Sequence, residues 1–365
     1  MKHSRQIFIS VIIAAISFSY YSCKKNDPAG PVNKNADSRS YSWSIDTIRT
    51  GTAPLLRLWG SNEKDIWLCG IREDFSRDLF HYDGNKAKPV NLPEAIEPGA
   101  VFGFSPADIW VAGDKFYEQD TLCFWHYNGV WSRTAKFNIP GYEICVINDI
   151  WGDSPDNVYA AGAAIHINSE RVFQSRTGLL FHYDGSQWTR VNAADVHNGF
   201  ARIRRGIKGS DKYYILSSAD AAGNVYTYRD TVKIFEFDGK DVKTLKSIYA
   251  NRDNGLWLNE IDKQLYITES SKIYRYRNGQ PELFLDNPYQ NHRVEIWGRN
   301  ESDIFLAMND GIAHYNGSNI EYIYKFSADK ISISDFIYFQ NSVFILAFDS
   351  STMSNIIIKG YSKNL

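Results

Sequence analysis

The 365-residue chain lacks an excess of either charge, because 40 lysines and arginines face 42 aspartates and glutamates. Proteins that bind the phosphates of DNA or RNA carry a basic surface, so the near-equal numbers of basic and acidic residues argue against nucleic acid as a partner. Cysteine is equally scarce. Beyond Cys23 the chain has Cys69, Cys123 and Cys145, without the CxxC spacing of zinc sites. We therefore expect no metal and no cofactor, and three small buried thiols, with one disulfide among them as the alternative.

Long apolar runs are missing except at the N-terminus. Residues 7–21 are apolar, follow a basic start and are too few to span a bilayer as a helix. Cys23 stands directly behind the small residue Ser22, and the whole pattern resembles a bacterial lipoprotein signal, although Tyr20 stands where such signals typically carry leucine. An ordinary secretory peptide with an incidental cysteine is the alternative.

This resemblance implies three segments. Residues 1–22 would be a signal peptide, and residues 23–40 a flexible tether behind an acylated Cys23. Two acyl chains suffice for durable anchoring, at about 0.8 kcal/mol per buried CH2 group. We therefore expect a protein of the cell envelope, anchored to the outer membrane through Cys23, on a side that the sequence leaves open. Residues 41–365 remain for one large domain.

One phrase recurs along this domain. It reads LWGSNEKDIWLCG from residue 58, FGFSPADIWVAG from 102, IWGDSPDNVYAAG from 150 and IWGRNESDIFLAM from 296. Weaker copies begin near residues 207, 256 and 335. Each copy consists of two apolar, aromatic or β-branched runs around a polar turn, which predicts a β-hairpin.

A second signature follows most copies of the first. Asp-Gly or Asn-Gly ends a short aromatic run at Gly84, Gly129, Gly185, Gly239, Gly279 and Gly317. These dipeptides favour a hairpin with a type I′ turn, in which both central residues have positive φ. Each repeat therefore supplies two hairpins, or four antiparallel strands.

Four strands in a repeat of about 40 to 55 residues are typical of a β-propeller. We expect an all-β fold, a seven-bladed β-propeller of four-stranded antiparallel blades. The last repeat lacks the Asp-Gly ending, whereas YSWSIDTI at 41–48 looks like a single outer strand. The N-terminal strand is therefore expected to close the last blade, which leaves no open sheet edge between the ends of the chain.

The tandem of IWGxSPxDVYxxG and HYDGxxW resembles propeller repeats of bacterial lipoproteins of the Bacteroidetes type, a largely uncharacterised group. The resemblance covers nearly the whole chain behind the tether and is clearest in blades one, two, three and six. It implies a propeller at the cell envelope and transfers no catalytic residue.

Residues that recur in the repeat are expected to be structural. The histidines sit on separate blades, too far apart to share one metal ion at about 2.0 to 2.1 Å. We expect packing or hydrogen-bonding roles for His81, His126, His182 and His314. The recurring indoles are expected in the core between blades: Trp59, Trp67, Trp110, Trp151 and Trp297. The recurring turn residues are expected to cap backbone amides: Asp65, Asp108, Asn157 and Asp303.

What differs between the repeats points to function. The connection between the second and third strands is short in blades five and six and extended in blades one to four, at 70–78, 113–120, 163–177 and 219–230. In a propeller these connections share one face with the links between blades, and long loops on one face of a rigid scaffold are where binding usually occurs.

Arginine and tyrosine on this face suit an anionic or sugar ligand, because the guanidinium fork binds carboxylate or phosphate and aromatic faces stack on rings. Arg202 and Arg204 alternate at the start of an innermost strand and are expected to look into the mouth of the channel. The predicted binding residues are Arg72, Arg77, Tyr117, Arg171, Arg176, Arg202, Arg204, Tyr226, Tyr228, Tyr289 and Arg293. Ordinary solvated loop charges are the alternative for each of them.

Two functions stay open. The first is a non-enzymatic binding or scaffolding module, monomeric, that takes a glycan, peptide or protein on the extended-loop face. The second is a carbohydrate-active enzyme, a glycosidase, lyase or glycosyl transferase, with carboxylates on the same face. The candidates are Asp74, Glu118, Asp120 and Glu170. The absence of a Walker loop, a GxSxG elbow, an HExxH helix and sialidase-type Asp boxes favours the first.

Overall fold

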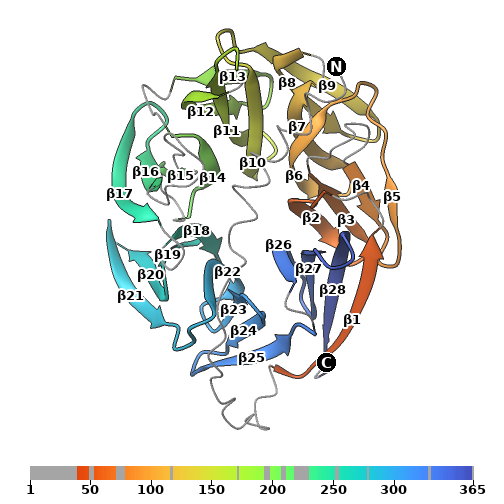
Figure 1. Ribbon diagram of the computed structural model, residues 1–365, viewed down its shortest axis with the longest axis vertical. Coiled ribbons are helices and arrows are strands. Elements are labelled where there is room, and N and C mark those ends of the chain that lie inside the picture. The colour runs from red at the N-terminus through yellow and green to blue at the C-terminus, as the bar shows by residue number, and fades with distance from the viewer. Residues whose placement is uncertain are drawn as a thin grey trace.

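The computed structural model describes residues 39–48, 53–70, 79–115, 118–170, 172–192, 198–206, 211–217, 230–250, 255–277, 279–327 and 330–363. They form seven four-stranded antiparallel sheets that stand around a common axis (Figure 1). The predicted seven-bladed propeller is confirmed. The signal segment, Cys23 and nearly all of the tether lie outside the described residues. Within the described ranges, no helix is long and apolar enough to cross a membrane.

The blades follow one another along the chain. Blade one is β2 (Arg57–Asn62), β3 (Asp65–Cys69), β4 (Leu79–Tyr82) and β5 (Ala87–Pro89). Blade two is β6 (Glu97–Ser105), β7 (Asp108–Lys115), β8 (Glu118–Tyr127) and β9 (Trp131–Asn138). Blade three is β10 (Ile144–Ser154), β11 (Asn157–Ile167), β12 (Phe173–Tyr183) and β13 (Trp188–Val191). Blade four is β14 (Phe200–Arg204), β15 (Tyr213–Ser217), β16 (Asp230–Phe237) and β17 (Val242–Ala250).

The remaining three blades complete the circle. Blade five is β18 (Leu256–Ile261), β19 (Gln264–Glu269), β20 (Lys272–Arg277) and β21 (Gln280–Asp286). Blade six is β22 (His292–Asn300), β23 (Asp303–Met308), β24 (Gly311–Tyr315) and β25 (Ile320–Lys325). Blade seven is β26 (Ile331–Tyr338), β27 (Ser342–Asp349), β28 (Ser354–Ser362) and, from the other end of the chain, β1 (Tyr41–Ile48).

The N-terminal strand closes the ring, as expected. β1 pairs antiparallel with β28 over its whole length, from Tyr41 opposite Ser362 to Ile48 opposite Asn355. Figure 1 shows the two strands side by side at the lower right. Backbone hydrogen bonds therefore tie the two ends of the propeller together.

The hydrophobic core consists of seven clusters, and each lies between two neighbouring blades. The predicted core indoles take part in them. Trp67, Trp110 and Trp297 are buried, and Trp59 and Trp151 are partly buried against the same clusters. Burial of one large apolar side chain stabilises by roughly 1.5 to 3 kcal/mol, so each blade contributes to the stability of both its neighbours. Cys69, Cys123 and Cys145 form no disulfide with one another and are fully buried in these clusters, and burial raises the pKa of the Cys145 thiol to about 12.

The prediction of type I′ turns at the Asp-Gly positions was wrong. Gly185 has φ of +90°, but Asp184 is not among the residues with positive φ. Four residues separate β12 from β13, and the Asp184 carboxylate accepts hydrogen bonds from the backbone N–H groups of Ser186 and Gln187. These bonds lower the pKa of Asp184 to about 2, with the Gln187 N–H contributing most. Because the side chain caps the loop, only the glycine needs the left-handed region.

Candidate functional site

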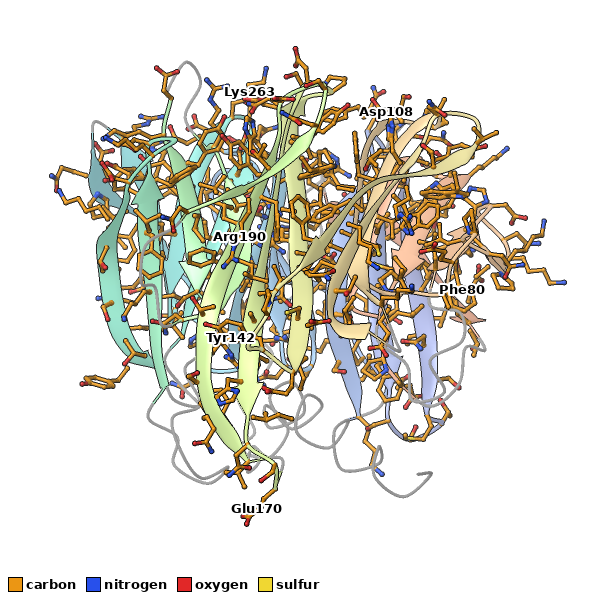
Figure 2. All side chains as sticks on the ribbon, turned by 90° about the horizontal axis from the view of Figure 1, so that it is seen from above. Phe80, Asp108, Tyr142, Glu170, Arg190 and Lys263 are labelled. Carbon is orange, nitrogen blue, oxygen red and sulfur yellow. The ribbon has the colours of Figure 1, made fainter. Side chains whose placement is uncertain are left out.

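The propeller has two unlike faces. The hairpin turns between first and second strands reach one face, where Figure 2 labels Asp108 and Lys263. The connections between second and third strands reach the opposite face, where Figure 2 labels Glu170 at the lowest point. We call these the turn face and the loop face. The loop face is the one that the sequence predicts to bind.

The predicted site residues divide into those that the structure describes and those that it does not. Outside the described residues lie Arg72, Asp74, Arg77, Tyr117, Arg171, Tyr226 and Tyr228. Glu118 belongs to β8, but its side chain is also outside the description. The described residues are Asp120, Glu170, Arg176, Arg202, Arg204, Tyr289 and Arg293.

The longest described projection on the loop face is the hairpin of β11 and β12, the arm. In blades five and six the same connection is a two-residue turn, whereas these two strands run for 11 residues each. Glu143, the residue before β10, braces the arm, because its Oε2 accepts a hydrogen bond from the Ile167 N–H at 2.8 Å and lies 2.9 Å from Nδ1 of His166. Burial acts to raise the pKa of Glu143, but these hydrogen bonds outweigh it and hold the pKa below the usual value.

The tip of the arm is ordered by a single amide side chain. Oδ1 of Asn168 accepts the N–H groups of Glu170 and Val172, at 3.0 and 2.8 Å. Val172 is 53% exposed, one of few large apolar side chains on the described surface with this exposure. Arg176 lies over the ring of Phe173, with its guanidinium carbon 5.7 Å from the ring centroid. The arm thus presents an apolar and a cationic group on a rigid support.

Of the four predicted carboxylates, the structure describes the side chains of two, Asp120 and Glu170, and it places them on different blades. Glu170 lies at the tip of the arm, whereas Asp120 belongs to β8 of blade two, where its Oδ1 accepts a hydrogen bond from Oγ1 of Thr121 at 3.3 Å. A different pair of carboxyl groups faces each other on blade two. Glu97 of β6 stands directly opposite Asp114 of β7.

Asp114 is the more unusual member of this pair. It is buried, and burial together with the charge of Glu97 holds its pKa well above the ordinary value. Sequence reasoning missed this pair. Asp114 lies in the extended connection 113–120, but nothing local shows that Glu97 stands opposite it. The signal available was one acidic residue on each side of the hairpin turn at residues 106–107. Among the described residues, no group of histidine, cysteine and carboxylate side chains could hold a metal ion.

The innermost strands place one residue of each blade at an equivalent register position beside the axis. These residues are Arg57, Ala100, Asp149, Arg202, Trp257, Glu295 and Asp335. Their charges meet across the ring: Arg202 of blade four interacts electrostatically with Asp335 of blade seven and with Glu295 of blade six. Charged side chains of both signs therefore lie beside the axis of the propeller.

Side chains next to the axis link six of the blades, all except blade two, in a circle that we call the inner polar ring. It is made of Arg57, Asn148, Asp149, Arg202, Asn259, Arg293 and Asp335. Arg57 donates to the Asn148 carbonyl, and Asn148 donates to the Phe200 carbonyl, at 2.9 and 2.8 Å. The circle continues from Arg202 to Asn259 at 3.4 Å, from Asn259 to the Ile296 carbonyl at 2.6 Å and from Arg293 to the Ile333 carbonyl at 3.3 Å. Asp335 closes it by accepting the Leu58 N–H at 3.1 Å.

Three predicted binding residues are engaged inside the protein. Arg204 pairs with Asp149 at 2.5 Å, and the same carboxylate oxygen accepts the Ile203 N–H. Arg293 forms two bonds to Glu295, at 2.7 and 3.1 Å. Tyr289 donates to the Ile320 carbonyl at 3.3 Å. Their geometry explains how the blades are held, and their role in binding stays a prediction.

Arg202 differs from these arginines. It is 5% exposed, its only hydrogen bond among the described residues is the 3.4 Å contact with Asn259, and it forms no ion pair there. Its guanidinium carbon stacks 4.1 Å from the centroid of the Trp257 ring. Burial, aided by repulsion from Arg204, lowers the pKa of Arg202 to about 9, so that it is charged at neutral pH.

The turn face carries the repeated histidines, and their structural role is confirmed. Each ring nitrogen Nε2 lies 2.7 or 2.8 Å from an oxygen on the second strand: His81 with Asp65, His126 with Asp108, His182 with Asn157 and His314 with Asp303. Each imidazole also contacts an aromatic ring, most closely where His126 stacks on Trp110 at 3.9 Å. Burial lowers the pKa of His314 despite its carboxylate partner.

The prediction that the recurring aspartates cap backbone amides was wrong. Asp65 bonds the side chains of His81, Trp67 and Ser61. The backbone capping comes from the preceding turn position instead, where Oδ1 of Asn62 accepts the Lys64 N–H at 2.9 Å. The aspartate begins the second strand, so its side chain points across the sheet to the histidine of the third.

A hollow of about 320 Å³ lies between blades four and five. It is lined by Lys212, Glu236, Lys243, Leu245, Tyr276, Gly279 and Gln280. Its single carboxylate, Glu236, is paired with Lys212 at 2.6 Å. A lone, paired carboxylate does not provide the two acid groups that glycoside hydrolysis needs.

Comparison with known proteins agrees on the fold. No family model and no curated protein matches the sequence. The solved structure of YCF48 bound to a D1 peptide is similar with a TM-score of 0.59 and 14% identity, over 93% of this chain and 100% of that one. Virginiamycin B lyase from Staphylococcus aureus gives 0.60 and 11%, over 88% and 99%. The extracellular domain of BT4673 from B. thetaiotaomicron gives 0.53 and 11%, over 86% and 39%. At these identities the similarity shows the propeller fold alone.

Proposed function

We propose that this chain is a binding propeller of the cell envelope, tethered through Cys23, which holds a peptide, protein or glycan partner on its loop face. The observation that carries the proposal is the arm. It is the longest described projection of the loop face, it is braced by Glu143, and it presents Val172 to solvent. An exposed apolar side chain on a rigid support gains free energy when a partner covers it, at little cost in ordering.

Two further facts support a binding role. The closed ring of blades is a stiff scaffold. The connections on its loop face differ in length and sequence from blade to blade, so that this face is not symmetric. Among the structural neighbours, YCF48 is known in a form bound to a peptide. A peptide or protein partner is therefore the first class to test.

An enzyme that acts on carbohydrates is the second candidate. The pair of Glu97 and the buried Asp114 favours it, because a carboxyl group with a raised pKa can act as a general acid. One structural neighbour is a lyase. If this candidate is right, Asp114→Asn abolishes turnover of a polysaccharide while the variant stays folded. Equal turnover by the variant and the wild type rejects it.

The binding proposal is tested by two matched valine variants. Val172→Asp places a charge on the arm, and Val130→Asp does the same on the turn face, where Val130 is 70% exposed. A partner is first selected from peptide and glycan arrays with the wild-type protein. We expect Val172→Asp to weaken its affinity at least tenfold and Val130→Asp to leave it unchanged. Equal affinity for both variants contradicts the proposed face.

A further inference from the structure

Arg202 is a buried cation without a counter-charge of its own. The other axial arginines have partners, because Arg204 pairs with Asp149, Arg293 pairs with Glu295 and Arg57 donates to two backbone carbonyls. Burial of an unpaired charge is costly, and proteins normally avoid it. A guanidinium has five N–H donors, of which the described residues engage one, at a long distance. The remaining donors need an acceptor.

These donors face space that solvent reaches. Fully buried polar atoms without a partner occur on several side chains of the described residues, and none belongs to Arg202. The contact with the Trp257 ring covers one side of the guanidinium and limits its movement. A planar fork held in this way is prepared for two parallel hydrogen bonds.

The surrounding charge selects the ligand. Arg57 and Arg204 lie near Arg202 together with the carboxylates Asp149, Glu295 and Asp335, and Glu260 interacts with Arg204. Among these arginines, Arg202 is the one that neither forms an ion pair nor donates a short hydrogen bond within the described residues. A singly charged group suits it, whereas a doubly charged phosphate would meet more repulsion from the nearby carboxylates. The planar geometry of a carboxylate also matches the fork.

We propose that Arg202, stacked on Trp257 beside the axis of the propeller, binds the carboxylate group of the ligand. This inference rests on the proposed binding function and names the group that the site recognises. The carboxylate accepts two N–H bonds from the Arg202 fork and forms the direct ion pair that no described side chain forms with it. The carboxylate of a sugar acid and the end of a peptide chain share this chemistry.

The test compares charged and neutral probes by isothermal titration calorimetry with the purified protein. The probes are D-glucuronate against D-glucose, and N-acetyl-trialanine against its C-terminal amide. We expect one of the two acids to bind at least ten times more tightly than its neutral counterpart, and the acid that does so identifies the source. Equal binding of acid and neutral probe, or no binding at millimolar concentration, overturns the inference.

Variants locate the effect. Arg202→Gln is expected to weaken binding of the acid at least tenfold, and Arg190→Gln, which changes an exposed arginine of β13 labelled in Figure 2, is expected to leave it unchanged. Retained affinity in a folded Arg202→Gln variant overturns the inference. If that variant fails to fold, the comparison of acid and neutral probes on the wild type still decides. The two proposals can fail separately. If Val172→Asp no longer binds the array partner but the wild type binds acid and neutral probes equally, this inference fails and the proposed function stands.

Discussion

Asp149 and Asp335 occupy the same position in blades three and seven and form the same bond. Each carboxylate accepts the backbone N–H of the next blade's innermost strand, Ile203 at 2.9 Å and Leu58 at 3.1 Å. Asp335 also accepts the Phe336 N–H at 2.9 Å. Burial raises the pKa of Asp335, and Arg57 and Arg202 oppose this effect. Single side chains therefore join blades where the backbone ladders do not.

Asp335→Ala tests this role. The change leaves two buried N–H groups without their acceptor, which costs about 1 to 3 kcal/mol of unfolding free energy. Chemical denaturation measures the loss. The control is Asp241→Ala, at an exposed turn position, which should change stability by less than about 0.5 kcal/mol. Unchanged stability of Asp335→Ala would show that the inner polar ring does not hold the blades.

At the scale of strands, the features that recur in every blade could be predicted from the sequence, and those that occur in one blade only could not. Hairpins were predictable because alternating apolar runs and Asp-Gly turns recur with every blade. The inner polar ring was not predictable, because its members do not recur: the axial register position that holds Arg57, Asp149, Arg202 and Asp335 carries alanine, tryptophan or glutamate in the other blades. Only closure of the circle brings these side chains together. The arrangement of Arg202 against Trp257, 55 residues later in the sequence numbering, has no local signal.

The hairpin of β6 and β7 gives a prediction about pH. The raised pKa of Asp114 means that the folded protein holds a proton that the unfolded chain releases above its ordinary pKa of 3.8. Wild-type stability therefore falls as the pH rises through the interval between these two values, at about 1.4 kcal/mol for each unit of pKa difference.

Asp114→Asn replaces the titrating carboxyl group by a neutral amide, so that unfolding no longer releases this proton. The variant should be more stable than the wild type at pH 7 to 8, and the gain should vanish as the pH approaches 4. Urea unfolding across this range measures it, with Asp241→Asn as the exposed control. A variant less stable than the wild type at pH 8 would mean that Asp114 is ionised and paired in the folded protein.

At the scale of the whole molecule, closure depends on the N-terminal strand. β1 buries Tyr41 and Ile48, and Asp46 accepts a bond from Lys359 of β28 at 2.7 Å. A chain that begins at residue 49 loses this strand. We expect a loss of several kcal/mol and a Tm lower by roughly 10 °C, measured by scanning calorimetry. A synthetic peptide of residues 39–48 should restore the Tm, and an unchanged Tm without it would contradict closure by β1.

The most direct test of the account is hydrogen–deuterium exchange of the protein with and without the partner selected from the arrays. The account predicts that the partner slows exchange on the loop face, in the arm between Ile165 and Phe173, and leaves the hairpin turns of the turn face unchanged. Protection confined to those turns, for example around Asp108 and Lys263, would contradict the claim that this propeller binds through its loop face.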